Sequence, residues 1–312
     1  MNKISKSLSI KDFAEAFGTD EGEIHRFCGD LIKSMNFKYE ICSQVTREKI
    51  LFDVIKKYDD AKLSVSGSHR RDDWRRGWGE ILQEFHVSGG DLKTLAPKYL
   101  HGDRPSRYKG NYIVSNSNSF EHDFALVFKH WLYKKYFGDY ENIYEFGCGT
   151  GQNLTIMAEI FPRKRFFGMD WVPESQELLS AIARKYGWQI KGIQFDLFNP
   201  DYALEILPDS LVYTFSSLEQ LGSAYGGFLD YLLAKKPSLC VNVECIAEYY
   251  DENKLYDYVA LRYHKKRNYL DGWLTRLREL EKGKSIKIIA TKRMRFGNLY
   301  HEGYMYVIWK IL

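Results

Sequence analysis

The chain has 312 residues, of which 45% are hydrophobic, 28% charged and 16% aromatic. These proportions are typical of a folded globular protein, and a net charge of +4 with interspersed acids and bases does not indicate nucleic-acid binding. The five cysteines form no CxxC pair, and their odd number excludes a complete disulfide framework within one chain. Together with the lack of a signal-peptide pattern and of any run of eighteen uncharged apolar residues, this predicts a cytoplasmic protein that is not in a membrane.

The first elements predicted are helical and extend from Leu8 to about Tyr58. Gly18 interrupts the pattern, and Thr19 or Asp20 is a suitable N-cap for a second helix. Apolar residues return to one helix face at Ile10, Phe13, Phe17, Ile24, Phe27 and Leu31. Such a pair could read DNA, but the acids that begin the second helix favour a packing role.

The stretch SGSHRRDDWRRGWGEILQEF, residues 66–85, combines four arginines with two tryptophans. One interpretation is a solvated helix whose tryptophans dock on the main domain. The other is an anion clamp over a substrate pocket, because the arginine guanidinium presents forked donors to phosphate or carboxylate. We favour the first.

Residues 98–124 are rich in Gly, Ser, Asn and Pro and predict a loop before a helix over 120–136. We therefore expect a mainly helical accessory segment over 1–110, which covers the substrate, and a second domain over 111–312.

Strands and helices alternate in this second domain. Strands are predicted at 142–147, 165–171, 190–198, 210–217 and 239–246, with helices between them and one long helix after the last. The final strands, 285–296 and 304–312, read as a hairpin. This pattern predicts an α/β fold with a doubly wound, mostly parallel seven-stranded sheet and a C-terminal antiparallel hairpin.

The turn after the first of these strands reads EFGCGTGQN. A dinucleotide-binding turn has the form GxGxxG, whereas Gln152 stands here where the third glycine would be. The carboxylate of Glu145 would repel a phosphate and attract an ammonium group. The turn therefore indicates an adenosine-like ligand that carries an amino group and no phosphate.

This turn resembles the first motif of the class I S-adenosylmethionine-dependent methyltransferases, and the resemblance covers about 111–312. It implies that Asp170, which ends the next strand, binds the ribose hydroxyls. It also implies that Asp196 binds the adenine amino group and that Leu197 covers the ring. The expected S-adenosyl-L-methionine site comprises Glu145, Gly147, Cys148, Gly149, Gly151, Asn153, Asp170, Trp171, Asp196, Leu197 and Ser216.

The fourth strand leads into SSLEQLG, which resembles the segment that lines the reaction centre of small-molecule methyltransferases. It lacks both the motif of nucleobase amino-methylating enzymes and the metal-binding acids of catechol-type enzymes, so we expect no metal ion. Glu219 is a catalytic candidate and Gln220 a substrate-binding one, although an acid here also suits a helix start.

Methyl transfer needs alignment of donor and acceptor, and a base only where the acceptor must lose a proton. The preferred base is His264, which follows the fifth strand, and the second candidate is His301 in the final hairpin. The predicted substrate-binding residues are Gln220, Glu244, Arg262, Tyr263 and Arg267.

This mixture of residues predicts O-methylation of a hydrophilic small molecule, such as a sugar or sugar-phosphate of surface-glycan or natural-product biosynthesis. Nucleic acid is not expected as a partner, and we allow for a homodimer. Two alternatives stay open: a protein or RNA methyltransferase, and a non-catalytic S-adenosylmethionine-binding regulator.

Overall fold

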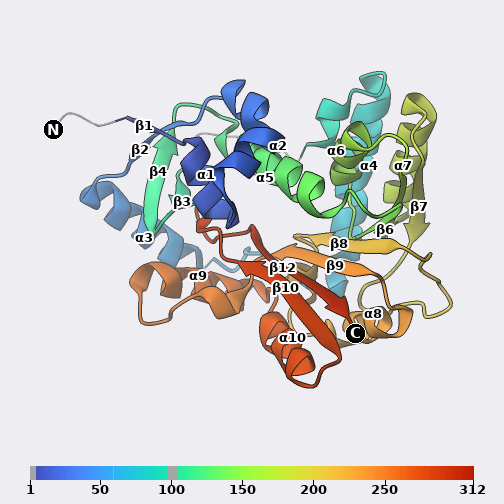
Figure 1. Ribbon diagram of the computed structural model, residues 1–312. Helices are drawn as coiled ribbons and strands as arrows, with labels where there is room; N and C mark the ends of the chain where they lie inside the picture. Colours follow the sequence, from blue (N-terminus) through green and yellow to red (C-terminus); the bar gives the residue numbers. More distant parts are fainter. Residues whose placement is uncertain (1–4, 59, 97–103) are drawn as a thin grey trace.

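The computed structural model describes residues 5–58, 60–96 and 104–312, which Figure 1 shows as ribbons. Its strands are β1 (Lys6–Ser7), β2 (Lys38–Ile41), β3 (Ser106–Tyr108), β4 (Asn111–Ser115), β5 (Asn142–Phe146), β6 (Arg165–Asp170), β7 (Ile190–Gln194), β8 (Ser210–Phe215), β9 (Leu239–Glu244), β10 (Ile286–Lys292), β11 (Phe296–Gly297) and β12 (Met305–Ile311). Its α-helices are α1 (Ile10–Phe17), α2 (Glu21–Lys33), α3 (Gln44–Tyr58), α4 (Arg71–Val87), α5 (Phe120–Tyr136), α6 (Gln152–Ile160), α7 (Pro173–Tyr186), α8 (Gly226–Lys235), α9 (Leu255–Arg267) and α10 (Trp273–Lys282).

The larger sheet has seven strands in the order β10-β12-β9-β8-β5-β6-β7. Strands β5 to β9 pair in parallel, and β12 is antiparallel to both β9 and β10. The expected fold class is thereby confirmed. The strand order reverses between β5 and β8, and open α/β sheets bind ligands beside such a reversal, at the carboxyl ends of the strands.

Helices cover both faces of this sheet (Figure 1). Helices α5, α6 and α7 bury their apolar residues against one face, while α8 and α10 pack on the other. All five residues of β5 are buried, as expected for a parallel strand covered on both sides.

The N-terminal helices follow the predicted pattern. Ser9 and Asp12 form a capping box at the start of α1, Gly18 closes it with φ 74°, and Asp20 caps α2. The helical pattern expected to continue to Tyr58 is interrupted, however, by β2. This strand pairs with β4, and such tertiary pairing outweighs a weak local helix preference.

A second, five-stranded sheet has the order β1-β2-β4-β3-β11. The turn between β3 and β4 contains residue 110, where we expected the domain boundary, and β11 comes from the C-terminal hairpin region. Phe13, Phe124 and Phe296 belong to one shared core. The division at residue 110 stays a prediction, and part of the predicted loop, 97–103, lies outside the described residues.

The long helix predicted after β9 is two helices, α9 and α10. Asn268 ends α9 in the left-handed conformation with φ 53°, a conformation that asparagine tolerates better than most residues. The break turns the chain so that Trp273 and Leu277 of α10 reach the core.

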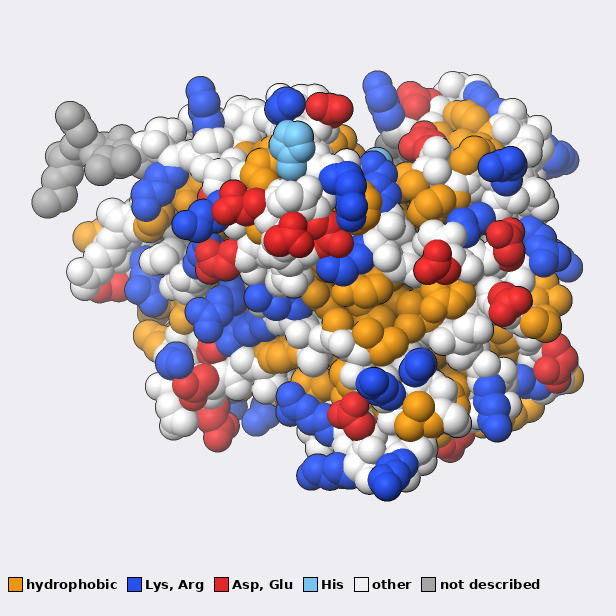
Figure 2. Space-filling view, in the orientation of Figure 1, with side chains coloured by type: hydrophobic (Ala, Val, Ile, Leu, Met, Phe, Trp, Pro, Cys, Tyr) orange, Lys and Arg blue, Asp and Glu red, His pale blue; other side chains and the backbone are white. Residues whose placement is uncertain are grey.

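The surface seen in Figure 2 carries Lys and Arg side chains spread among Asp and Glu. Within the described residues, no helix has the length and apolar character needed to cross a membrane.

Candidate functional site

The glycine turn lies between β5 and α6, beside the reversal of strand order. Gly147, Gly149 and Gly151 have φ values of 76°, 52° and 75°, which side-chain-bearing residues rarely adopt. A Cβ on Gly147 would lie 2.3 Å from Ser217 Cβ, and one on Gly151 would lie 2.3 Å from Leu179 Cδ2. Backbone conformation and close neighbours therefore both require these glycines.

Asp170, at the end of β6, is bonded to this turn. Its Oδ2 accepts the Gly149 N–H at 2.9 Å, and its Oδ1 accepts the Val172 N–H at 3.2 Å. Burial raises the pKa of Asp170 to about 6, against the effect of these hydrogen bonds. The carboxylate thus holds the glycine turn in place and also lines a cavity.

Glu145, near the end of β5, is only 1% exposed. Its Oε1 accepts a hydrogen bond of 2.6 Å from Asn153 Nδ2, while its Oε2 has no partner among the described residues. Burial raises the pKa of Glu145 to about 8 and lowers that of nearby Lys129 to about 8. Asn153 and Lys129 line a large cavity next to the glycine turn, whereas the buried Glu145 side chain does not.

A small cavity of about 90 Å³ lies at the ends of β6 and β7. Asp170, Trp171, Leu197 and Phe198 line it, and the rings of Trp171 and Phe198 stack with centroids 5.7 Å apart. Asp196 is not among its lining residues. Its Oδ1 accepts the Phe198 N–H at 2.9 Å, and its predicted contact with the adenine amino group stays a prediction.

Two tryptophans of α4 border the small cavity and the larger one beside it. Trp74 and Trp78 stack with centroids 5.3 Å apart, and a Cβ on Gly149 would lie 2.9 Å from the Trp78 ring. Arg71 donates a hydrogen bond to the Trp171 carbonyl and Arg75 pairs with Glu174, both at 2.9 Å, which fixes α4 over the site. The tryptophans dock on the main domain as we favoured, but the sequence did not identify them as cavity residues.

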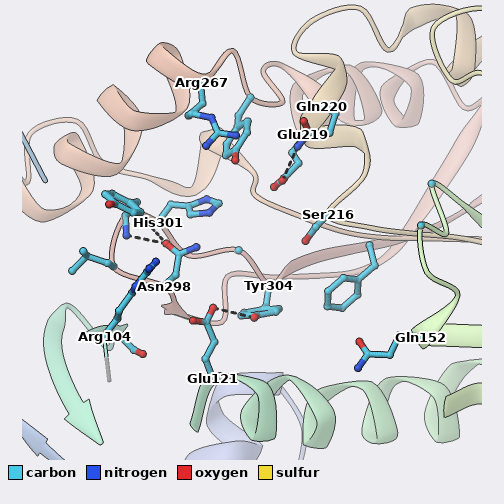
Figure 3. A pocket seen from close by; sticks show the side chains of 18 of the residues that line it. Arg104, Glu121, Gln152, Ser216, Glu219, Gln220, Arg267, Asn298, His301 and Tyr304 are labelled. Atoms are coloured by element: carbon cyan, nitrogen blue, oxygen red, sulfur yellow. Dashed lines mark hydrogen bonds between the residues drawn. The ribbon is translucent and has the colours of Figure 1, made fainter. Parts of the chain in front are cut away.

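The larger cavity encloses about 510 Å³. Figure 3 shows Arg104, Glu121 and Tyr304 on the opposite side of this cavity from Arg267 and Glu219. The Tyr304 hydroxyl donates to Glu121 Oε1 at 3.1 Å, and burial raises the pKa of Glu121 to about 7. The cavity therefore has charged groups on both sides. Sequence reasoning missed Arg104, Glu121 and Tyr304, because local pattern does not show that their segments meet.

The segment after β8 forms part of both cavities. Ser216 has φ 52°, a strained value for a residue with a side chain, and it lines both cavities together with Gln220. Glu244 stabilises this segment by accepting the Ser217 and Glu219 N–H groups, both at 3.2 Å. Because Glu244 is fully buried and does not line the cavity, our expectation that it reaches the substrate is corrected.

Glu219 lines the large cavity, and its burial raises the pKa of the carboxyl to about 7. Tyr263 and Arg267 of α9 also line it, and Arg267 Nη1 donates to the Tyr263 hydroxyl at 3.1 Å. Arg262 is exposed on α9 and does not line the cavity, because the helix turns it to another face.

Of the two candidate histidines, the second choice, His301, reaches the large cavity, and the preferred one, His264, does not. His301 lines the large cavity, whereas His264 is 3% exposed and lies behind it, with 3.1 Å between His264 Nε2 and His301 Nδ1. Burial lowers the pKa of His264 to about 3 and that of His301 well below its usual range. The preferred base therefore has no direct access to the cavity.

Most of the predicted cofactor residues line one of the two cavities. They are Gly147, Cys148, Gly149, Asn153, Asp170, Trp171, Leu197 and Ser216. Glu145, Gly151 and Asp196 do not line them: the two carboxylates accept hydrogen bonds from Asn153 and Phe198, and Gly151 precedes α6.

Comparison with known proteins gives likeness in structure and none in sequence. No protein-family model matches the chain, and no curated protein matches it significantly. The [4+2]-cyclase SpnF superposes with a TM-score of 0.51 at 10% identity, over 80% of this chain and 98% of SpnF.

Two methyltransferase structures superpose over less of the chain. For the O-methyltransferase NcsB1 from neocarzinostatin biosynthesis the TM-score is 0.41 at 12% identity, over 62% of this chain and 58% of NcsB1. For a SAM-dependent methyltransferase from Aquifex aeolicus it is 0.40 at 14% identity, over 57% of this chain and 87% of that protein.

At these identities the likeness concerns the fold. A mostly parallel seven-stranded sheet, a glycine turn after β5 and an antiparallel C-terminal strand agree with the architecture expected above. The chain therefore has a Rossmann-like α/β fold, which it shares with SpnF.

Proposed function

We propose that the protein transfers a methyl group from S-adenosyl-L-methionine to a hydroxyl of a hydrophilic small molecule, such as a sugar or sugar-phosphate. One observation carries this proposal: a small aromatic cavity and a large polar cavity adjoin and share Gly147, Ser216 and Gln220. A cofactor whose adenosine lies in the small cavity would direct its methyl group towards the large one.

The residues of the small cavity suit the adenosine part of this cofactor. Trp171, Leu197 and Phe198 offer apolar contacts to a base, and Asp170 offers carboxylate oxygens to ribose hydroxyls. The unpartnered Oε2 of Glu145 supports an ammonium group nearby, with Asn153 between Glu145 and the cavity. These features fit a sulfonium amino acid attached to adenosine.

The large cavity suits a polar acceptor. Arg104 and Arg267 offer forked donors to a phosphate or carboxylate, and Glu121 and Gln220 accept hydrogen bonds from hydroxyls. An acceptor of this kind exchanges its hydration for these side chains as it enters.

When bound, the cofactor supplies an electrophilic methyl group for an in-line displacement. The protein orients the acceptor and excludes water, which is the larger part of such catalysis. Glu219 and His301 are the cavity-lining candidates for removing the acceptor proton, and His264 acts through His301 as a positioning residue.

The fold alone does not assign the reaction, because SpnF, which shares it, is described as a [4+2]-cyclase. The same cofactor cavity would also serve the two alternatives, a non-catalytic S-adenosylmethionine-binding regulator and a protein or RNA methyltransferase. The test must therefore measure cofactor binding, methyl transfer and acceptor class separately.

The experiment incubates the protein with methyl-labelled S-adenosylmethionine and separate metabolite, RNA and protein fractions. We expect the label in a small polar product, with at least about a hundredfold lower rate for the base variant, Glu219→Gln or His301→Gln. Label in RNA or protein alone would assign the acceptor to that class. Calorimetric binding without transfer to any fraction would favour the regulator, and absence of binding would overturn the proposal.

A further inference from the structure

A cluster of three metal-ligating side chains lies at the wall of the large cavity, and one of them, His301, lines it. Cys245, His264 and His301 each offer one ligand atom, and these atoms all lie within 4.8 Å of one another. The three residues are buried, with exposed fractions of 0%, 3% and 6%. They come from the end of β9, from α9 and from the segment before β12, so the fold rather than the local sequence brings them together.

The spacing of the two imidazoles matches metal ligation. Their closest nitrogens are 3.1 Å apart, and two nitrogens bound to tetrahedral zinc at about 2.0–2.1 Å are about 3.3 Å apart. With a zinc–sulfur bond of about 2.3 Å, the sulfur would lie about 3.5 Å from each nitrogen. The ligand atoms, which lie within 4.8 Å of one another, need to close by about 1.3 Å at most, which side-chain rotation can supply.

Hydrogen bonding does not use the full capacity of this cluster. His264 Nε2 and His301 Nδ1 share one hydrogen bond, which zinc would replace with a bond to each nitrogen, and the other ring nitrogen, His264 Nδ1, is buried with no partner among the described residues. The Cys245 thiol interacts with the Glu219 carboxylate, which lines the large cavity. A carboxylate beside a thiol and two imidazoles completes a four-ligand set for zinc.

We propose that Cys245, His264 and His301 bind a divalent zinc ion whose fourth position faces the large cavity, where Glu219 or an acceptor oxygen completes the coordination. A zinc-bound His301 has no free lone pair, so with zinc in place Glu219 is the remaining base candidate of the proposed transfer. Cys245 loses its proton on binding, so the thiolate and the Glu219 carboxylate offset the metal charge beside Arg107 and Arg267. This differs from our expectation of no metal ion, which rested on missing magnesium-type acids.

The test uses cobalt(II) as a spectroscopic probe and metal analysis of the purified protein. We expect about one zinc per chain after growth in zinc-containing medium, and a thiolate-to-cobalt charge-transfer band after exchange. Loss of an outer-shell partner typically lowers metal affinity about 10–100-fold, so Cys245→Ser should lower it at least about 100-fold and abolish the band.

The matched control is Cys240→Ser, which changes another fully buried cysteine, in β9 and outside the cluster, and should keep the band. A wild-type protein without the band, or a Cys245→Ser protein that keeps it, overturns the proposal. If Cys245→Ser does not fold, His301→Gln provides the second variant, in which the band should weaken. None of these measurements depends on methyl transfer, so they separate the metal site from the proposed function.

Discussion

The Asp170 carboxylate accepts the Gly149 N–H at 2.9 Å, which links the end of β6 to the glycine turn after β5. The group proposed to bind ribose is thus also the group that orients the turn. Removing it changes the cofactor site twice, through a lost ligand contact and through a released backbone N–H.

We expect Asp170→Ala to weaken S-adenosylmethionine binding by about 1–3 kcal/mol, the usual effect of leaving hydrogen-bond partners unsatisfied. Calorimetry on the folded variant measures it. Asp201→Ala is the control, because Asp201 is exposed and accepts an N–H from the chain two residues on without touching either cavity. Unchanged affinity in Asp170→Ala would remove Asp170 from the cofactor site, and binding of NAD with similar affinity would contradict the role of Glu145.

Gly151→Ala should destabilise the protein more than Gly187→Ala. Both glycines have positive φ, 75° and 68°, so both substitutions carry backbone strain of about 1–2 kcal/mol. Only at Gly151 does the new Cβ meet a side chain, at 2.3 Å from Leu179, whereas nothing lies within 4 Å at Gly187. Urea unfolding should show an extra loss of about 1–3 kcal/mol for Gly151→Ala. Equal losses would mean that the turn has room to relax.

Trp78→Ala should weaken cofactor binding about tenfold, because an aromatic contact contributes about 0.5–1.5 kcal/mol beyond its buried area. Cofactor titration followed by tryptophan fluorescence should also lose much of its signal change. The comparison is Trp188→Ala, which removes a tryptophan that stacks on Tyr186 and lines neither cavity. A cofactor affinity that is the same in both variants would show that the α4 tryptophans do not contact the ligand.

The stability difference between wild type and Glu145→Gln should depend on pH. Burial raises the pKa of Glu145 from 4.5 to about 8, so the folded state keeps a proton that the unfolded state releases. The contribution of Glu145 to the free energy of unfolding is fully present below pH 4.5. It is lost as pH rises towards 8, by up to about 1.4 kcal/mol per pH unit. Burial lowers the pKa of Lys129 to about 8, so the titration of Lys129 changes the stability only above about pH 8.

Urea unfolding at intervals from pH 5 to pH 8 measures this dependence. Glu252→Gln, which changes an exposed carboxylate in the turn before α9, should stay parallel to wild type. A constant difference between wild type and Glu145→Gln would mean that Glu145 is ionised in the folded protein throughout.

The sequence predicts the elements of the seven-stranded sheet well, because long buried strands and amphipathic helices have clear periodicity. The helix over 120–136 was predicted with the bounds that α5 has. The five-stranded sheet was not predicted, since β1, β3 and β11 have only two or three residues each and are too short to show a period. Their pairing depends on contacts between distant parts of the chain.

The same limit applies to the site. Residues attached to the strand ends, such as Asp170 and Ser216, follow from the fold pattern and line the cavities. Trp78 and Glu121 do not, because their places depend on how α4 and α5 pack on the sheet. His264 was the preferred base because it lies on the helix after the fifth strand. The sequence does not show which side of that helix faces the cavity, since this depends on the segments that pack around the helix.

The place of β11 has a consequence for the order of assembly. This strand pairs with β3 and so completes the sheet formed by β1 to β4. In the sequence, however, it comes late, between β10 and β12 of the last hairpin. A ribosome-bound chain that has formed β1 to β4 therefore exposes an unpaired β3 edge until that hairpin emerges. His301 and Tyr304, which line the large cavity, follow β11 in the sequence. The large cavity is therefore completed in the same late step, and a chain that ends before these residues lacks one side of it.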